Sequence, residues 1–152
     1  MIAVQAATVP PRPTRSRYPE PFAALMAGRT KRVLGELFGL TNFGVNLTTL
    51  EPGARSALHH RHSAQDEFVY VLDGEAVIIR GSEEVIAGPG TCAGFKAGGD
   101  AHHIENRGQR PVTYLEIGDR TRPDRATYPL DDLEAEATEQ GWRFSHKDGS
   151  PY

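Results

Sequence analysis

The hydrophobic positions of this chain fall into many short runs rather than into long amphipathic stretches. From about residue 31, runs rich in Val, Ile, Leu, Phe and Tyr alternate with turn residues such as Gly, Pro, Asn and Asp. The expected strands are 32–38, 43–50, 58–62, 67–72, 76–80, 83–86, 91–96, 102–106 and 112–117. Short strands separated by frequent turns are typical of an antiparallel sandwich or barrel. The pattern therefore predicts an all-β barrel over residues 31–120.

Two dipeptides between these runs predict tight turns. Asp73-Gly74 separates two strongly apolar runs, and Gly81-Ser82 separates the next two. Both pairs suit the two-residue turns that join antiparallel strands. We therefore expect a β-hairpin at each.

The two ends of the chain have a different pattern. Residues 1–30 form an arm whose prolines fix the backbone and remove hydrogen-bond donors, so that it lies extended against the barrel or a partner; these are prolines 10, 11, 13, 19 and 21. The tail, residues 121–152, contains an acidic stretch rich in helix formers at 131–140, followed by Gly141. This stretch predicts a short C-terminal helix that ends at the glycine. Arm, barrel and tail together are expected to form one domain.

Composition excludes several classes of partner and location. The chain of 152 residues has 17 Lys and Arg against 20 Asp and Glu, a net charge of −3, so neither nucleic acid nor an anionic membrane is an expected partner. One cysteine, Cys92, rules out an intrachain disulfide and lies in an apolar run where we expect it to be buried. No apolar stretch is long enough to span a bilayer, and no basic leader opens the chain, so a cytoplasmic location is expected.

Candidate chemistry is concentrated in the histidines. Five of the six lie in two clusters, and the first cluster is followed by Glu67. His60 and His62 are two residues apart, so on a strand both side chains point the same way. Glu67 begins the next strand, which we expect to return antiparallel beside them. Imidazole and carboxylate together suit a divalent transition metal, and on spacing alone either His102 or His103 completes the set.

These residues form two longer patterns. The first is Gly, six residues, His-x-His, four residues, Glu, six residues, Gly, and its members are Gly53, His60, His62, Glu67 and Gly74. The second is Gly, three residues, His, three residues, Asn, and its members are Gly98, His102 and Asn106. Over about residues 45–120 the chain resembles the cupin family. It departs from the second cupin motif at Lys96, where the family has proline, and in a gap one residue longer. The register favours His102 over His103.

The resemblance implies a double-stranded β-helix, or jelly-roll barrel, with one metal ion inside. His60, His62, Glu67 and His102 would be the ligands, and Glu67 would also act in catalysis. Asn106 is expected to orient a ligand, and Tyr114 and Phe95 to line the core or the pocket. The resemblance also implies a homodimer that pairs through the arm. It does not distinguish Fe, Mn, Zn and Ni.

Two classes of function follow. The first is a metal-dependent enzyme acting on a small molecule, either a dioxygenase or an isomerase of a sugar or sugar phosphate. The second is a non-catalytic cupin that binds or senses a small ligand. A phosphorylated substrate would need cations at the mouth of the site, and the candidates are Arg55, Arg61, Arg80 and Lys96, for which ordinary surface charge is the alternative.

Overall fold

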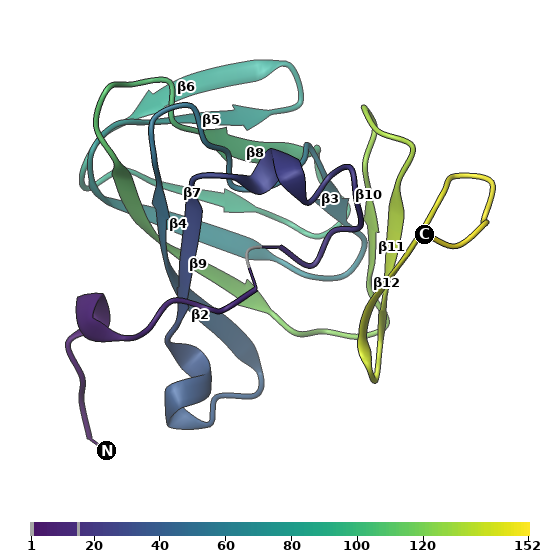
Figure 1. Ribbon diagram of the computed structural model, residues 1–152, viewed down its shortest axis with the longest axis horizontal. Helices are drawn as coiled ribbons and strands as arrows, with labels where there is room; N and C mark the ends of the chain where they lie inside the picture. Colours follow the sequence, from purple (N-terminus) through teal and green to yellow (C-terminus); the bar gives the residue numbers. More distant parts are fainter. Residues whose placement is uncertain (1, 15) are drawn as a thin grey trace.

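The computed structural model describes residues 2–14 and 16–152, and most of its regular secondary structure is strand (Figure 1). One wall of the molecule is a five-stranded antiparallel sheet in the order β1-β2-β9-β4-β7. Its strands are β1 (Arg29–Val33), β2 (Phe43–Leu50), β4 (Glu67–Asp73), β7 (Cys92–Phe95) and β9 (Val112–Asp119).

The opposite wall consists of two smaller sheets joined end to end. The three-stranded sheet β6-β5-β8 contains β5 (Ala76–Arg80), β6 (Glu83–Ala87) and β8 (His102–Glu105). The four-stranded sheet β12-β11-β10-β3 contains β3 (Arg61–His62), β10 (Arg125–Thr127), β11 (Glu134–Thr138) and β12 (Gly141–Ser145). Isolated bridges from Arg55 to Glu105 and from His60 to His102 link them. Residues 55–62 thus run from one small sheet into the other.

The main core lies between the two walls. On β4, Val69 and Val71 face inward and are 4% and 1% exposed, whereas Phe68 and Tyr70 face outward and are both 39% exposed. The inward residues of β2, β4, β7 and β9 pack against Ala76, Ile78, Ala87 and Ile104 from the opposite wall. This two-residue alternation is what a half-buried sheet requires. The predicted all-β double-stranded β-helix is confirmed.

The predicted C-terminal helix over 131–140 is wrong. Residues 134–138 form β11, which pairs with β12 in a hairpin. Leu133 and Ala135 are buried while Glu134 and Glu136 point outward, so the segment alternates with a period of two. Its pairing with the aromatic residues of β12 outweighs the helix propensity of its residues.

One of the two predicted hairpins is also wrong. The Gly81-Ser82 turn joins β5 to β6 as expected. The Asp73-Gly74 turn instead sends the chain from one wall to the other, because β4 pairs with β7 and β9 while β5 pairs with β6 and β8. Gly74 has φ of +78°, and a Cβ there would lie 2.4 Å from the carbonyl oxygen of Pro111. The glycine is needed at this corner by close backbone packing as well as by its φ.

Helical structure in the described part of the chain is limited to three short 3₁₀ turns. They are η1 (Ala6–Thr8), η2 (Ala24–Met26) and η3 (Gly35–Phe38), and the last replaces the second half of the strand expected at 32–38. None of these helices is long and apolar enough to cross a membrane.

Cys92 is exposed rather than buried. On β7 it occupies an outward position, across the pleat from the inward Ala93 and Phe95.

A second, smaller core lies between the arm and the C-terminal hairpin. Phe22 and Met26 from the arm pack with Leu58, Tyr128 and other residues, and Tyr18, Trp142 and Phe144 cover this cluster. The arm therefore follows its own barrel and reaches the hairpin β11–β12 (Figure 1).

Candidate metal centre

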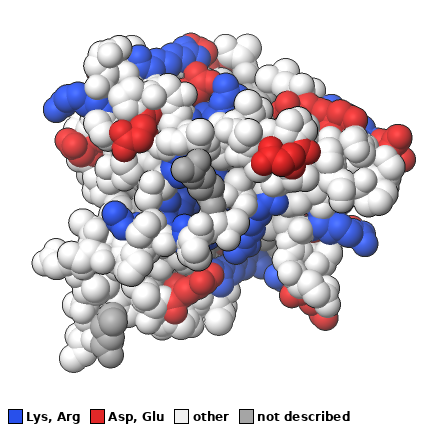
Figure 2. Space-filling model, viewed as in Figure 1, with Lys and Arg blue, Asp and Glu red and all other residues white. Residues whose placement is uncertain are grey.

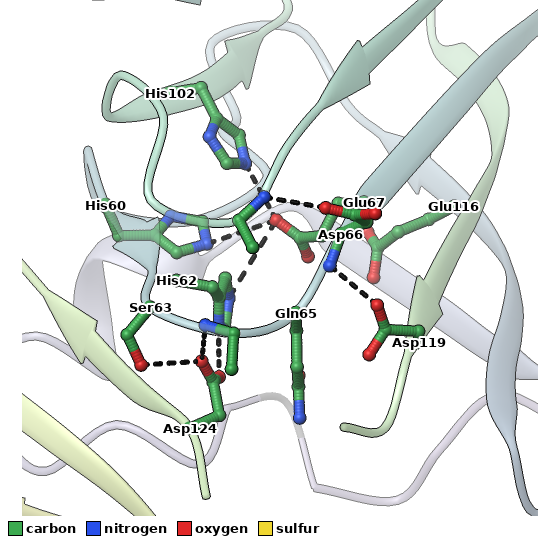
Figure 3. Close-up of polar contacts among 12 residues, drawn as sticks. His60, His62, Ser63, Gln65, Asp66, Glu67, His102, Glu116, Asp119 and Asp124 are labelled. Atoms are coloured by element: carbon green, nitrogen blue, oxygen red, sulfur yellow. Dashed lines mark hydrogen bonds and ion pairs between the residues drawn. The ribbon is translucent and has the colours of Figure 1, made fainter. Parts of the chain in front are cut away.

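Three imidazole rings converge on the carboxylate of Glu67 (Figure 3). The Nε2 atoms of His102, His60 and His62 lie 2.7, 3.6 and 3.8 Å from Glu67 Oε2. Ligand atoms of His60, His62 and Glu67 all lie within 4.8 Å of one another. His102 completes the cluster through its contact with Glu67 and its ring, 4.8 Å from that of His60.

The four residues come from opposite walls of the barrel. His60, His62 and His102 belong to the wall built from the two smaller sheets, and Glu67 opens β4 in the five-stranded sheet. The expectation that the Glu67 strand pairs beside the first histidines is wrong, because β3 pairs with β10. Glu67 instead faces the histidines across the interior.

The second nitrogen of each ring lies within reach of a separate acceptor. Nδ1 of His60 lies 2.8 Å from the carbonyl oxygen of Leu58, and Nδ1 of His62 lies 2.6 Å from Asp124 Oδ2. Nδ1 of His102 lies 3.4 Å from the carbonyl oxygen of Asp100. With a metal ion bound, a proton on each Nδ1 would leave the Nε2 lone pair for the ion, which is the tautomer a metal ligand requires.

The pKa values reflect this convergence. Burial acts to raise the pKa of Glu67, but hydrogen bonds from His102 and His60 and the nearby imidazoles lower it well below its usual value. Burial acts to lower the pKa of His60, yet the adjacent Glu67 carboxylate raises it overall. The centre therefore holds an ionised carboxylate within a ring of bases.

The donor set fits one divalent transition metal. Ligand atoms bound about 2.1 Å from one ion lie roughly 3.0–3.4 Å apart. The 2.7, 3.6 and 3.8 Å separations between Glu67 and the three histidines bracket that spacing. Three imidazoles and one carboxylate also leave coordination positions open for water or a substrate.

Asp124 is a site residue that the sequence did not reveal. It is fully buried, and its carboxylate accepts hydrogen bonds from His62 Nδ1 at 2.6 Å, from the Ala64 amide at 2.8 Å and from the Ser63 hydroxyl at 3.2 Å. It lies 62 residues after His62, outside both motifs, and reaches the site because β10 pairs with β3. Predicting its role would have required knowledge that β10 pairs with β3, and no local sequence pattern indicates that pairing.

An aromatic ring lies against each histidine. The Phe95 ring stacks on His102 with centroids 3.8 Å apart and the planes 2° from parallel. Tyr128 stacks on His60 at 5.9 Å, and Trp142 meets His62 edge-on at 5.6 Å. These rings restrict the orientation of the imidazoles and shield them from water.

The centre opens into a cavity of about 290 Å³. Its walls combine the aromatic residues Tyr18, Phe95, Tyr128, Trp142 and Phe144 with a set of cationic side chains from the arm and β1. A concave site that combines aromatic walls with convergent polar and charged groups suits a polar small molecule.

Three other residues singled out from the sequence lie away from this cavity. The Asn106 amide donates to the carbonyl oxygens of Leu50 and Arg110, both at 2.8 Å, and so holds a turn rather than a histidine. Tyr114 is fully buried in the main core. His103 faces away from the centre, with Nε2 2.9 Å from Glu105 and Nδ1 3.0 Å from His59 Nδ1.

The cations proposed from the sequence for a phosphate lie elsewhere. Arg61, Arg80 and Lys96 line a second hollow that also borders Glu67. Arg55 lies 3.9 Å from Glu105, near the outer pair of histidines.

The fold and this centre define a class of protein: a small β-barrel with a His/Glu cluster suited to a metal and a cavity open to small molecules. A family model described as the cupin domain matches residues 46–118. The chain belongs to the cupin superfamily, as a 40% identical structure of that superfamily also shows. Curated proteins provide no significant match.

Three solved structures are similar to this chain to different degrees. A protein described as a sugar phosphate isomerase of the cupin superfamily, from Silicibacter pomeroyi, is 40% identical with a TM-score of 0.92, over 99% of this chain and 96% of that one. A candidate sugar phosphate isomerase from Acidithiobacillus ferrooxidans is 29% identical with a TM-score of 0.74, over 82% and 80% of the two chains. The polyketide cyclase RemF from Streptomyces resistomycificus, at 18% identity, a TM-score of 0.66 and coverage of 82% and 83%, shares the fold alone.

Proposed function

We propose that this protein is a metal-dependent isomerase of a phosphorylated sugar. The observation that carries the proposal is the convergence of three Nε2 atoms on Glu67 inside a cavity of about 290 Å³. The two similar structures described as sugar phosphate isomerases favour this reaction over dioxygenation.

Isomerisation of an aldose to a ketose moves one proton between adjacent carbons and one between their oxygens. A divalent metal held by His60, His62, His102 and Glu67 would polarise the substrate carbonyl. The contacts of Glu67 with the histidines all run through Oε2, which leaves Oε1 to take the carbon-bound proton and return it to the neighbouring carbon. The aromatic walls exclude water and so limit loss of that proton to solvent.

The test is a proton NMR assay of metal-reconstituted protein with aldose and ketose phosphates in deuterium oxide. We expect interconversion with partial deuterium incorporation at the carbon next to the carbonyl, because the proton held on Oε1 exchanges with solvent in only part of the turnovers. Glu67→Gln should lower kcat by about 10²–10⁴-fold, the usual contribution of a general base. Absence of turnover and of deuterium exchange with Mn, Fe, Zn and Ni forms alike would contradict the proposal.

The non-catalytic alternative predicts a different outcome of the same assay. A sensing cupin would bind a sugar phosphate without exchange of its carbon-bound protons. Oxygen uptake with small organic acids or phenols would indicate dioxygenation instead. The homodimer and the cytoplasmic location stay predictions.

A further inference from the structure

The N-terminal arm is fastened across one side of the cavity. The Arg12 amide donates to the carbonyl oxygen of Lys31 at 2.8 Å, and Arg32 donates to the carbonyl oxygen of Val9 at 2.5 Å. Farther along, the Tyr18 ring packs edge-on against Tyr128 and Phe144, each at 5.7 Å. The arm is thus held to β1 at one end and to the hairpin wall at the other, so its side chains form part of the cavity lining.

The arm and β1 bring four cations to this cavity. The cationic lining residues are Arg12, Arg17, Arg29 and Lys31, and the acidic ones are Glu67 and Glu116. Lys31 is paired with Glu116 at 2.6 Å, and Glu67 is held among the histidines. Three guanidinium groups therefore line a cavity in which one carboxylate is paired with a lysine and the other lies among the histidines. This local excess of positive charge contrasts with the net charge of −3 of the whole chain.

Arginine side chains also line the adjoining hollow. Arg12 and Arg17 border both spaces, and Arg120 and Arg122 join them in the second. Figure 2 shows Lys and Arg side chains gathered in the hollow between the barrel and the C-terminal hairpin. In that hollow, however, the arginines are accompanied by as many carboxylates, namely Glu36, Glu67, Glu116 and Asp119. The excess of cations over carboxylates lies in the arm cavity, where it attracts anions.

Like charges within the cluster act on one another. Burial and the proximity of Arg17 and Arg29 lower the pKa of Arg12. A dianionic oxyanion between these groups would offset that repulsion. Guanidinium groups suit phosphate because their planar fork donates two parallel hydrogen bonds.

We propose that Arg12 and Arg17 of the arm, with Arg29 behind them, form the subsite for the phosphate group of the substrate. The sugar end then extends into the same cavity toward His60, His62 and His102. Arg29 supplies charge from a fixed position, because its side chain is buried and donates to the carbonyl oxygen of Ser56. The identity of the ligand rests on the proposed function, whereas the binding of an anion does not.

The hollow lined by Arg61, Arg80 and Lys96 is a weaker candidate. Arg80 pairs with Glu83 at 3.0 Å, and Asp66 and Asp100 lie in the same hollow. The three histidines line the arm cavity and not this one.

Trp142 provides the readout, because it is the only tryptophan in the chain and lines both the cavity and the adjoining hollow. Its fluorescence is titrated with inorganic phosphate, glucose 6-phosphate and glucose, using metal-free protein. We expect saturable binding of the two phosphates that weakens with salt, and at least tenfold weaker binding of glucose. The double variant Arg12→Gln/Arg17→Gln should lose at least tenfold in affinity for both phosphates.

Two further variants and an unfolding measurement test whether a loss of phosphate affinity comes from the arm arginines themselves and not from a change in net charge or in folding. Arg110→Gln removes an exposed arginine outside the cavity and should leave both affinities unchanged. Arg12→Lys keeps the charge but loses the fork, and should bind more weakly than the wild type and more tightly than Arg12→Gln. Unchanged thermal unfolding of the double variant shows that the arm remains in place.

The outcomes distinguish this inference from the proposed function. Phosphate affinity unchanged in the double variant, or equal affinity for glucose and glucose 6-phosphate, overturns the subsite. Failure of inorganic phosphate to compete with glucose 6-phosphate overturns its assignment to the substrate. If phosphate binding depends on the arginines but no turnover is found, the subsite is supported and the proposed isomerase function is rejected.

Discussion

The carboxylate of Asp124 contacts His62 on the side opposite the metal cluster. It is buried, its Oδ2 accepts a hydrogen bond from His62 Nδ1 at 2.6 Å, and it is itself held by the Ala64 amide. Such a partner orients the ring and raises its basicity as a ligand. Part of the affinity for a metal in this cluster would therefore depend on a residue that the metal does not touch.

Replacing this carboxylate should weaken metal binding without removing a ligand. We expect Asp124→Asn to lower metal affinity by about 10–100-fold, as loss of such partners typically does. Asp119→Asn is the matched control, because Asp119 accepts from the backbone of Asp66 and Thr121 and from no histidine. Competition with a chelator measures both. Equal affinity of wild type and Asp124→Asn would show that His62 needs no such support.

The pH dependence of metal binding should follow the histidines and not Glu67. Metal binds the neutral imidazole, and the raised pKa of His60 means that a proton competes with the metal for this ring as the pH falls. Glu67 stays ionised because its pKa is well below the usual value. Affinity should therefore be greatest above the raised pKa of His60 and fall by about tenfold per pH unit below it. Equilibrium dialysis between pH 8 and pH 5 measures it, and affinity constant over that range would contradict the assignment.

Among the elements, the strands of the barrel followed from local pattern and the connections between them did not. The ranges 43–50 and 76–80 agree with β2 and β5, because alternation within a strand reflects a buried and an exposed face. The Asp73-Gly74 corner and the hairpin β11–β12 depended on contacts with distant segments. For the same reason the sequence patterns identified His60, His62, Glu67 and His102, but neither Asp124 nor the arm arginines.

The corner at Gly74 should be sensitive to a single methyl group. An added Cβ would lie 2.4 Å from the carbonyl oxygen of Pro111, at a φ of +78° that is strained for alanine. We expect Gly74→Ala to lower the free energy of unfolding by about 2 kcal/mol or more. Gly53→Ala is the control, since Gly53 has φ of +82° but no heavy atom within 4 Å of the added Cβ, so only the backbone strain of about 1 kcal/mol remains. Urea denaturation that gives equal losses would show that the close contact relaxes freely.

For the whole molecule, the homodimer implied by the cupin family remains a prediction. The alternation that buries Val69 and Val71 leaves Phe68, Tyr70 and Leu72 on the outside of β4, 39%, 39% and 43% exposed. Ile117 and Leu115 lie opposite Phe68 and Tyr70 on β9, so the apolar strip extends across two strands. A contiguous apolar surface of this kind commonly marks an interface.

We expect a second copy of the chain to cover this strip. Tyr70→Glu should then shift the protein from dimer to monomer in sedimentation velocity, because a carboxylate would be buried in the interface. Tyr152→Glu alters an exposed tyrosine elsewhere and should have no effect. A wild-type protein that is monomeric at micromolar concentration would contradict the dimer.

The central claim is that His60, His62, Glu67 and His102 hold one metal ion inside the barrel. Elemental analysis of untagged protein, reconstituted and dialysed, tests it most directly. We predict about one equivalent of a divalent transition metal per chain in the wild type and its loss in His102→Ala. The control His146→Ala should retain the metal, because His146 lies at the surface against Tyr152 and Asp132. A full equivalent in His102→Ala, or no metal in the reconstituted wild type, would contradict the claim.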